Sequence, residues 1–521
     1  MQSRFANLAR RLLSKSGSTL VRESCVKQFV TLGLALAVFT AGSAHAAGPE
    51  DLPEIGSPAT ATISLADEYR IGRMMIQGLR DQGQILDDPE VSEYLQSIGL
   101  RLSSQAPEAA RQFKFLVVKD STINAFALVG GFVCVNSGLI LQTHDESELA
   151  GVLAHEISHV TQRHIARAVT AQSRNGIIST AAMLAAILLG AAAGGDAALA
   201  GVAAAQTLAV EQQVRFSRSE EAEADRVGIG LMAQAGFDPN AMAAFFEVLQ
   251  RQLGHPDESQ IPAILLDHPV TTDRIAEAKA RAAQMPAMPT PQDSFGYGLV
   301  RERLRVLLTP AGSDPREYYA SRTKDDSQTA VTDLYGKGLA LMAVGQAKDA
   351  VNIFSKLRAG NGQIVQFHTA LGQAQLLAGD GRGAIATFER ARKLFPRNVP
   401  LTVHYGEALM RLGDPKRAHQ VLLDLFNVVE PTPDQARLIA QAANAAGDVA
   451  DAYYYMSEYH IMGGELPLAI GQLQLALNTP NLTQVQKARF TARLEEIQRA
   501  LPRRVRTQSS ADRERISNVS W

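Results

Sequence analysis

Residues 151–164, with the sequence GVLAHEISHVTQRH, contain two histidines four positions apart and a glutamate directly after the first histidine. In a helix, residues four apart lie on one face about one turn apart, so His155 and His159 converge on one point. With 11 histidines in 521 residues, this pattern arises by chance in roughly one such chain in a hundred. The pattern predicts that His155 and His159 bind a zinc ion and that Glu156 is the general base toward an attacking water molecule.

A catalytic zinc ion takes a third protein ligand and keeps its fourth position open. His164 lies nine residues after His155, about 180° around the same helix, so that helix cannot bring it to the same ion. Residues 219–225, SEEAEAD, form an acidic cluster at the start of a further helical stretch. Glu221 and Asp225 share a face there. One carboxylate can bind the metal while the other accepts the N–H of a ligand histidine.

The HEISH sequence and this acidic cluster together resemble the gluzincin metallopeptidases, the family that includes HtpX and the CAAX prenyl protease. The third ligand of that family is the first acid of an E-x-x-x-D motif. The resemblance implies a zinc metalloendopeptidase with one Zn²⁺ per chain, in which Glu221 is the third ligand and Asp225 supports catalysis behind the ligands. Glu220 and Glu223 then remain as solvated helix charges.

The resemblance extends to residues 124–139. In this family, the segments that match residues 124–127, Gly130-Gly131 and residues 137–139 form the strand and turn beside the active-site helix. An extended peptide can pair with an exposed strand edge through main-chain hydrogen bonds without requiring a particular sequence. We therefore expect substrate to bind along Asn124, Ala125 and Phe126.

A histidine further along the chain matches a motif of the periplasmic members of this family. In that motif, His268-Pro269 with Arg274, the histidine approaches the zinc ion and holds the enzyme inactive. We expect His268 to be such a regulatory group and Arg274 to lie behind the metal ligands. Only the resemblance selects these residues, because a lone histidine in a loop is by itself a weak signal.

The second half of the chain contains a repeat of 34 residues, the length of the tetratricopeptide unit. Glycines in the turn reverse the chain, and small residues let paired helices approach closely. One column comprises Gly345, Gly379, Gly413 and Gly447, each followed five residues later by an alanine (Ala350, Ala384, Ala418 and Ala452). A second column comprises Gly338, Gly372 and Gly406, and the bulky residues Phe354, Phe388 and Leu422 follow it. Gly464 and Ala469 predict a last hairpin, and the alternative to this assignment is an unrelated helical array.

The N-terminus has the pattern of a secretory signal. Six basic residues and one acidic residue precede the apolar run from Phe29 to Ala41, which is too short to span a bilayer of about 30 Å, and Ala44-His45-Ala46 is a small-x-small cleavage site. We expect cleavage after Ala46 and a periplasmic protein; the alternative is an uncleaved membrane anchor. Of the two cysteines only Cys134 would then remain, which suits an oxidising compartment.

The predicted fold is mainly α with a small β-sheet: a zincin-like metalloprotease domain followed by an α-solenoid of tetratricopeptide repeats. Two β-prone stretches, residues 113–119 and 125–140, predict the sheet. We expect a signal peptide at 1–46, a flexible leader at 47–62, the protease domain at 63–283, a proline-rich linker at 284–296, a connecting helical segment at 297–328, the repeats at 329–501 and a disordered tail at 502–521.

Residues 175–210 contain a single charged residue and divide at Gly194-Gly195 into two alanine-rich halves. Each half is short for a membrane span. We favour a helical hairpin that covers the active site or makes a peripheral membrane contact; the alternatives are a buried core pair and a re-entrant segment.

These observations favour a periplasmic zinc endopeptidase that degrades misfolded or stalled envelope proteins and has a chaperone-like role in outer-membrane protein assembly. By resemblance its partners are unfolded outer-membrane proteins and the barrel-assembly and lipopolysaccharide-export machinery. A net charge of −2 leaves no basic excess for nucleic acid. The alternatives are a non-catalytic repeat scaffold or chaperone with a structural or silent zinc site, and a membrane-embedded prenyl-protein protease.

Overall fold

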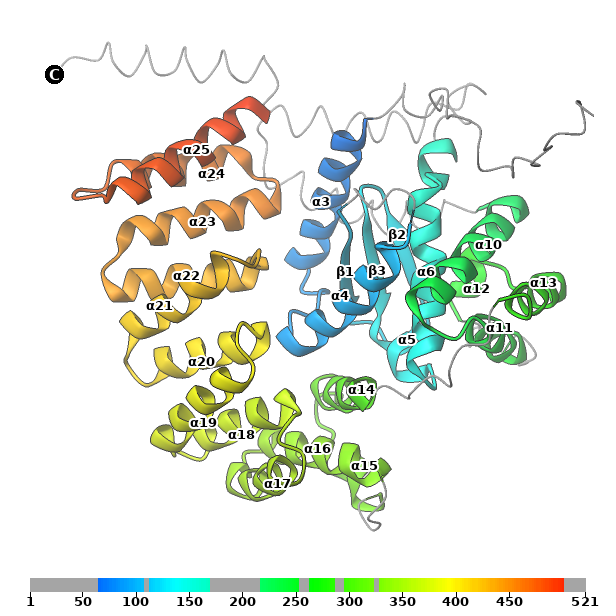
Figure 1. Ribbon diagram of the computed structural model, residues 1–521, viewed down its shortest axis with the longest axis horizontal. Coiled ribbons are helices and arrows are strands. Elements are labelled where there is room, and N and C mark those ends of the chain that lie inside the picture. Colours follow the sequence, from blue (N-terminus) through cyan, green and yellow to red (C-terminus); the bar gives the residue numbers. More distant parts are fainter. Residues whose placement is uncertain are drawn as a thin grey trace, which may run out of the picture. The chain divides into compact units, whose positions relative to one another are not determined.

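The computed structural model describes residues 64–106, 112–168, 216–252, 262–285, 295–322 and 328–500. The segments predicted as signal peptide, leader, alanine-rich hairpin and tail lie outside the described residues, as does most of the predicted linker. The described residues are mainly helical and contain one three-stranded sheet, which confirms the predicted fold class (Figure 1). No helix within these ranges is long and apolar enough to cross a bilayer.

The sheet has the order β1-β3-β2. Strand β1 (Lys114–Val118) pairs in parallel with β3 (Phe132–Asn136), and β2 (Ala125–Leu128) pairs antiparallel with β3. The hairpin between β2 and β3 turns at Gly130 and Gly131, whose φ angles of 82° and 89° favour glycine. The turn that the two glycines predicted is therefore present.

The β-prone stretch was predicted to run to Ile140, and this is wrong beyond Asn136. Residues Ser137–Gln142 form a short helix, α5, instead. Its start is fixed by Asp120, whose carbonyl oxygen accepts hydrogen bonds from Ser137 Oγ at 2.7 Å and from the Gly138 amide at 2.8 Å. A Cβ atom on Gly138 would lie 2.1 Å from the Ser121 carbonyl oxygen, so only glycine permits this close approach.

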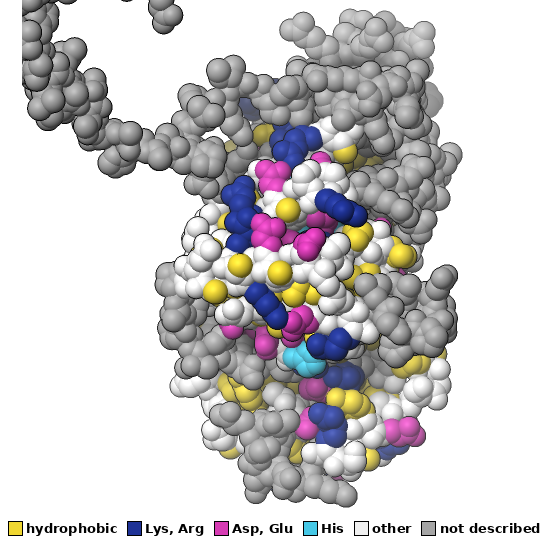
Figure 2. Space-filling model, turned by 90° about the vertical axis from the view of Figure 1, so that its right-hand side faces the viewer, with side chains coloured by type: hydrophobic (Ala, Val, Ile, Leu, Met, Phe, Trp, Pro, Cys, Tyr) yellow, Lys and Arg dark blue, Asp and Glu magenta, His cyan; other side chains and the backbone are white. Residues whose placement is uncertain are grey.

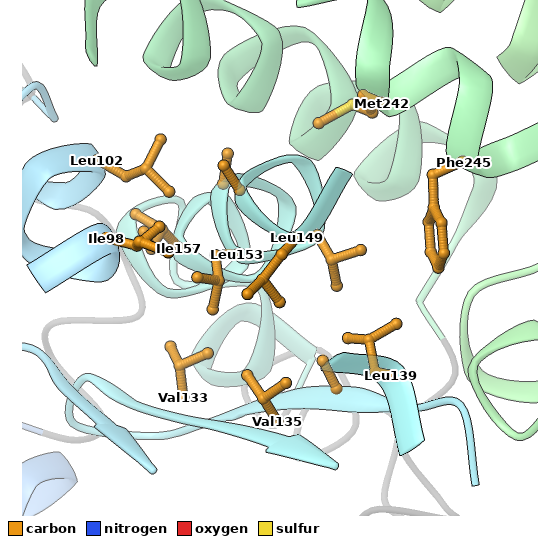
Figure 3. Packing of buried hydrophobic residues seen from close by; sticks show 14 of the residues in the cluster. Ile98, Leu102, Val133, Val135, Leu139, Leu149, Leu153, Ile157, Met242 and Phe245 are labelled. Atoms are coloured by element: carbon orange, nitrogen blue, oxygen red, sulfur yellow. The ribbon is translucent and has the colours of Figure 1, made fainter. Parts of the chain in front are cut away.

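Helices cover both faces of the sheet. Alternate side chains of a strand point to opposite faces, so each strand contributes to two cores. Helix α3 (Leu65–Asp81) packs on one face, against Phe132 and Cys134. Helices α4 (Pro89–Ser103) and α6 (Glu146–Thr161) share the other face, where Val133 and Val135 of β3 meet Leu149 and Leu153 of α6 (Figure 3).

Helix α6 lies at the centre of this core, with no exposed residue between Ser147 and Thr161. Helix α10 (Arg218–Ala235) crosses α6 so closely that a Cβ atom on Gly228 would be 3.2 Å from the backbone of Ala154. The shorter helices α11 (Asn240–Gln252), α12 (Ile264–Asp267) and α13 (Thr272–Ala282) complete this part of the chain. Both helices that carry predicted ligands are thus fixed by packing along their length.

The second half of the described chain is a series of antiparallel helices (Figure 1). Its helices are α14 (Phe295–Leu307), α15 (Glu317–Ala320), α16 (Gln328–Ala343), α17 (Ala347–Gly360), α18 (Val365–Leu377), α19 (Gly381–Leu394), α20 (Val399–Arg411), α21 (Pro415–Phe426), α22 (Pro433–Ala446), α23 (Val449–Gly463), α24 (Leu466–Leu477) and α25 (Gln484–Ala500).

Both predicted glycine columns have the expected structural role. The turn glycines Gly345, Gly379, Gly413 and Gly447 have φ between 80° and 88°. In the second column, a Cβ atom on Gly338 would lie 2.5 Å from the ring of Phe354, and one on Gly372 would lie 2.6 Å from the ring of Phe388. Gly464 ends α23 in a left-handed conformation, as the predicted last hairpin requires.

A buried charge network joins the two halves. Glu90 of α4 accepts from Arg303 of α14 at 3.0 Å, and its Oε2 lies 3.0 Å from Nε2 of His404 in α20. Burial lowers the pKa of His404, but the charges of Glu90 and Glu407 outweigh burial and raise it to about 10. The same partners hold the pKa of Glu90 below its usual range against the opposing effect of burial.

The His404 contact should make stability depend on pH in the alkaline range. A histidine with a raised folded pKa stabilises fully below the unfolded pKa of about 6.5 and loses that contribution as pH rises toward 10. We expect His404→Gln to lower the unfolding free energy by about 1–3 kcal/mol at pH 6 and by progressively less up to pH 10. Urea unfolding across this range measures the effect. The exposed His144→Gln variant is the control, and a pH-independent difference would contradict the assignment.

Candidate metal centre

Helix α6 presents His155, Glu156 and His159 from one buried face. Its start is fixed by Asp145, whose side chain accepts from the Glu148 amide at 2.9 Å. From α10, Asp225 Oδ1 lies 2.9 Å from His155 Nδ1. These predicted residues therefore come together although they are 70 positions apart in the chain.

Four side chains bring possible ligand atoms within 4.8 Å of one another: His155, His159, Glu221 and His268, all buried. The Nε2 atoms of His155 and His159 are 3.0 Å apart. The Glu221 carboxylate lies 3.5 Å from His155 Nε2 and 3.6 Å from His159 Nε2. Neighbouring ligand atoms of a tetrahedral zinc site with bonds of about 2.0–2.1 Å are about 3.3 Å apart, so the arrangement has the size that zinc requires.

The hydrogen bonds around the imidazoles also call for a cation. Carboxylates such as Asp225 only accept hydrogen bonds, so Nδ1 of His155 carries a proton and Nε2 is the nitrogen that can bind a metal ion. Nε2 faces Nε2 of His159 over 3.0 Å, so either a proton or a metal ion must lie between the two nitrogens. Oε2 of Glu221 forms an ion pair with Arg274 at 2.7 Å and lies 3.5 Å from His155 Nε2. A divalent cation among these atoms would satisfy all three.

The carboxylates also determine the charge of the metal-free site. Burial lowers the pKa of His155, but hydrogen bonds to Asp225 and Glu221 outweigh burial and raise the pKa to about 10. Burial alone would raise the pKa of the Glu221 carboxyl, but the nearby His268 and His155 lower it below its usual range. A metal ion must therefore displace a proton, so metal affinity falls as pH falls.

Glu156 is buried beside the ligands and lies against strand β2. Burial raises the pKa of its carboxyl, while the histidines His268 and His155 oppose this rise. The backbone of Ala127 hydrogen-bonds with the same carboxylate. A carboxylate with a raised pKa, close to the ligand cluster, is placed as a general base should be.

His268 occupies the fourth corner of the cluster. It follows the one-turn helix α12, and its Nδ1 lies 3.3 Å from His155 Nε2 and 2.9 Å from Glu221 Oε1. Arg274 lies behind the cluster, as expected, and its Nε donates to Asp225 Oδ2 at 2.8 Å. Phe216, which the sequence analysis did not select, stacks on His268 with ring centroids 5.5 Å apart.

The predicted substrate strand lies at the edge of the sheet. The amide of Asn136 donates to the carbonyl oxygen of Asn124 at 2.9 Å, so by the antiparallel alternation Ala125 and Ala127 direct their main-chain groups away from β3. No strand pairs with this outer edge among the described residues. The side chain of Phe126, which was predicted to bind substrate, packs toward α3.

Glu223 is not the solvated charge that we expected. Its Oε2 lies 3.0 Å from Nε2 of the fully buried His164 and accepts from Arg167 at 2.8 Å. His164 does not join the ligand group, as the spacing predicted, but its Nδ1 lies 2.8 Å from Nδ1 of His159. Glu220, by contrast, forms a capping box with Ser217 at the exposed start of α10.

Comparison with known proteins agrees with both halves of the chain. The model of peptidase family M48 matches residues 89–282, and tetratricopeptide repeat models match residues 335–399 and 375–442. The beta-barrel assembly-enhancing protease of Escherichia coli is 32% identical over 478 residues, which cover 90% of this chain and 95% of that protein. The protein of the same description from Yersinia pestis is 32% identical over 86% of this chain and 92% of its own length. Metalloprotease LoiP of Escherichia coli is 28% identical over 41% of this chain and 82% of its own length.

Removing the metal should destabilise the part of the chain around α6 and α10. A cation binds the facing Nε2 atoms of His155 and His159 only in the folded site, so a chelator should lower the midpoint of thermal unfolding. One equivalent of zinc should restore it, with a stabilisation of about 4 kcal/mol at a free concentration of 1,000 times Kd. Calorimetry with parallel metal analysis measures both. Equal midpoints with and without chelator would show that these four groups hold no ion.

Proposed function

Because the chain belongs to the family of the beta-barrel assembly-enhancing proteases and carries the metallopeptidase domain of family M48, we propose that it is a zinc-dependent endopeptidase of the periplasm. Its substrates are misfolded or stalled envelope proteins, outer-membrane proteins above all, and it has a chaperone-like role in their assembly. The observation that carries the catalytic part is the buried cluster of His155, His159 and Glu221 with Glu156 beside it.

The residues of the chain divide the catalytic work. His155, His159 and Glu221 would hold the zinc ion, which when bound polarises the scissile carbonyl group and makes water a stronger nucleophile at neutral pH. Glu156 takes a proton from the attacking water and delivers it to the leaving nitrogen. Burial, which raises its pKa, makes that carboxyl able to hold the proton between the two steps.

Substrate pairs with the outer edge of β2. An extended chain that donates hydrogen bonds to the outward-facing carbonyl oxygens of Ala125 and Ala127 would lie beside Glu156, because the backbone of Ala127 itself hydrogen-bonds with that carboxylate. Main-chain pairing requires no particular sequence, which suits an enzyme that acts on unfolded proteins. On the face that Figure 2 shows, acidic and basic side chains of the described residues are interspersed.

The repeat helices recruit the substrate or the machinery that handles it. Solenoids of this kind expose extended binding surfaces. The relatives in Escherichia coli and Yersinia pestis are described as enhancing beta-barrel assembly, and this description supports a partner at the barrel-assembly site. Contact with the lipopolysaccharide-export machinery rests on the family resemblance. The signal sequence with its cleavage site after Ala46 supports secretion to the periplasm.

Replacing Glu156 with Gln should separate catalysis from metal binding. The amide cannot accept the proton of water, so cleavage of unfolded porin or casein should fall by about 10²–10⁴-fold while zinc stays near one per chain. Peptide mapping by mass spectrometry and metal analysis measure the two quantities. Turnover that survives Glu156→Gln would sink this mechanism and favour the non-catalytic scaffold, in which the zinc ion is structural or silent.

His268 keeps the enzyme latent by filling the fourth corner of the metal site. Replacing it with Ala opens the position that water needs, so His268→Ala should cleave unfolded porin several-fold faster than the unmodified protein at equal zinc content. Initial rates at saturating zinc measure this effect. Arg281→Ala, which removes an exposed ion pair to Glu277 on α13, is the control. Unchanged or lower rates for His268→Ala would contradict latency.

A further inference from the structure

A buried histidine that the catalytic scheme leaves without a role touches the metal ligand His159. The ring of His164 is fully buried and edge-on to that of His159, with centroids 4.7 Å apart and an angle of 80° between the planes. Its Nδ1 lies 2.8 Å from His159 Nδ1, on the side of the ligand ring that faces away from the cluster. On its other side, Nε2 lies 3.0 Å from Glu223 Oε2, which also accepts from Arg167.

A sharp turn in the backbone makes this contact possible. Helix α6 ends at Thr161, and Arg163 adopts a φ of 55°, a left-handed conformation that is uncommon for a residue other than glycine. A buried ion pair between Arg163 and Glu68 of α3 accompanies the turn. The reversal brings His164 back toward His159, a position that a continuous helix would not allow.

The hydrogen bonds permit only one arrangement of protons. His159 can bind a cation through Nε2 only if its proton is on Nδ1. That proton needs an acceptor, so Nδ1 of His164 carries a lone pair and Nε2 of His164 carries the proton. This second proton points at Glu223, a carboxylate that only accepts. In the reverse assignment, His159 would direct an N–H at the metal position and a lone pair of His164 would face the carboxylate.

We propose that His164 and Glu223 are positioning residues that hold the second metal-binding imidazole in its metal-binding tautomer and orientation. The two ligand histidines then have parallel supports from one helix. Asp225 accepts a hydrogen bond from Arg274 and holds His155 directly. Glu223 accepts a hydrogen bond from Arg167 and holds His159 through His164. Both acids lie on α10, on either side of Ala224, and the same helix supplies the ligand Glu221.

Zinc affinity, measured by competition with a chromogenic chelator on the full-length mature chain, tests this inference. His164→Leu removes the acceptor and should weaken zinc binding by about 10–100-fold. His164→Asn places an amide oxygen near the position of Nδ1 and should recover most of the affinity. Cobalt substituted for zinc adds a spectroscopic readout, because a rotated His159 changes the ligand field in His164→Leu but not in the exposed control His144→Leu.

Double variants test the order of the relay. If Glu223 acts through His164, adding Glu223→Gln to His164→Leu should weaken zinc binding no further, whereas adding Asp225→Asn, which acts on the other imidazole, should weaken it by a further factor. Unchanged affinity and spectrum in His164→Leu, or equal losses in the Leu and Asn variants, would overturn the proposal. The inference rests on the metal-binding part of the proposed function alone, so an inactive protein with an intact zinc site would refute the proposed function and not the relay.

Discussion

Two imidazole nitrogens, Nε2 of His155 and of His159, face each other over 3.0 Å, and this contact is the constraint on which the rest of the catalytic half depends. Either a proton or a metal ion must lie between them, and the fold imposes this approach because the far side of each ring is held in place. Asp225 holds His155, and His164 stands behind His159. Helix α6, which carries both rings, is itself buried between the sheet and α10. Metal binding and the folding of this core are therefore linked equilibria.

Helix α4 is the element that the catalytic half shares with the repeats. Its apolar face, with Ile98 and Leu102, packs against Ile157 of α6, close to the metal ligands (Figure 3). Its first turn carries Glu90, which meets His404 of the repeats in a buried ion pair. Breaking this pair removes one of two buried partners of the Glu90 carboxylate, a change that costs about 1–3 kcal/mol. The described residues of the two halves are therefore joined by buried contacts at α4.

Local patterns in the sequence predicted most of the site, and long-range contacts account for what they missed. The spacing of His155 and His159 and the glycine columns of the repeats follow directly from helix geometry, so both can be recognised in the sequence. The helical spacing could not reveal the contact between His164 and His159, because it applies only to a continuous helix and α6 ends at Thr161. The turn at Arg163 contains no glycine that would predict it from the sequence, and Glu68, the ion-pair partner of Arg163, is 95 residues away in the chain.

The four side chains of the candidate metal centre lie on helices of very different length, and this difference identifies the side chain that can most easily move out of the cluster. His155 and His159 lie on a helix of 16 residues that is buried along its length, and Glu221 lies on one of 18 residues. His268 follows a helix of only four residues, of which Ile264 and Leu265 are the buried ones. Displacing either long helix would disrupt the main core along many residues, whereas displacing α12 would uncover two residues of that core, Ile264 and Leu265, and the low-stability segments of a protein are the ones that open first. In the proposed mechanism, His268 on its short helix is therefore the group that would leave the cluster when substrate reaches the edge of β2, while the other three would stay in place.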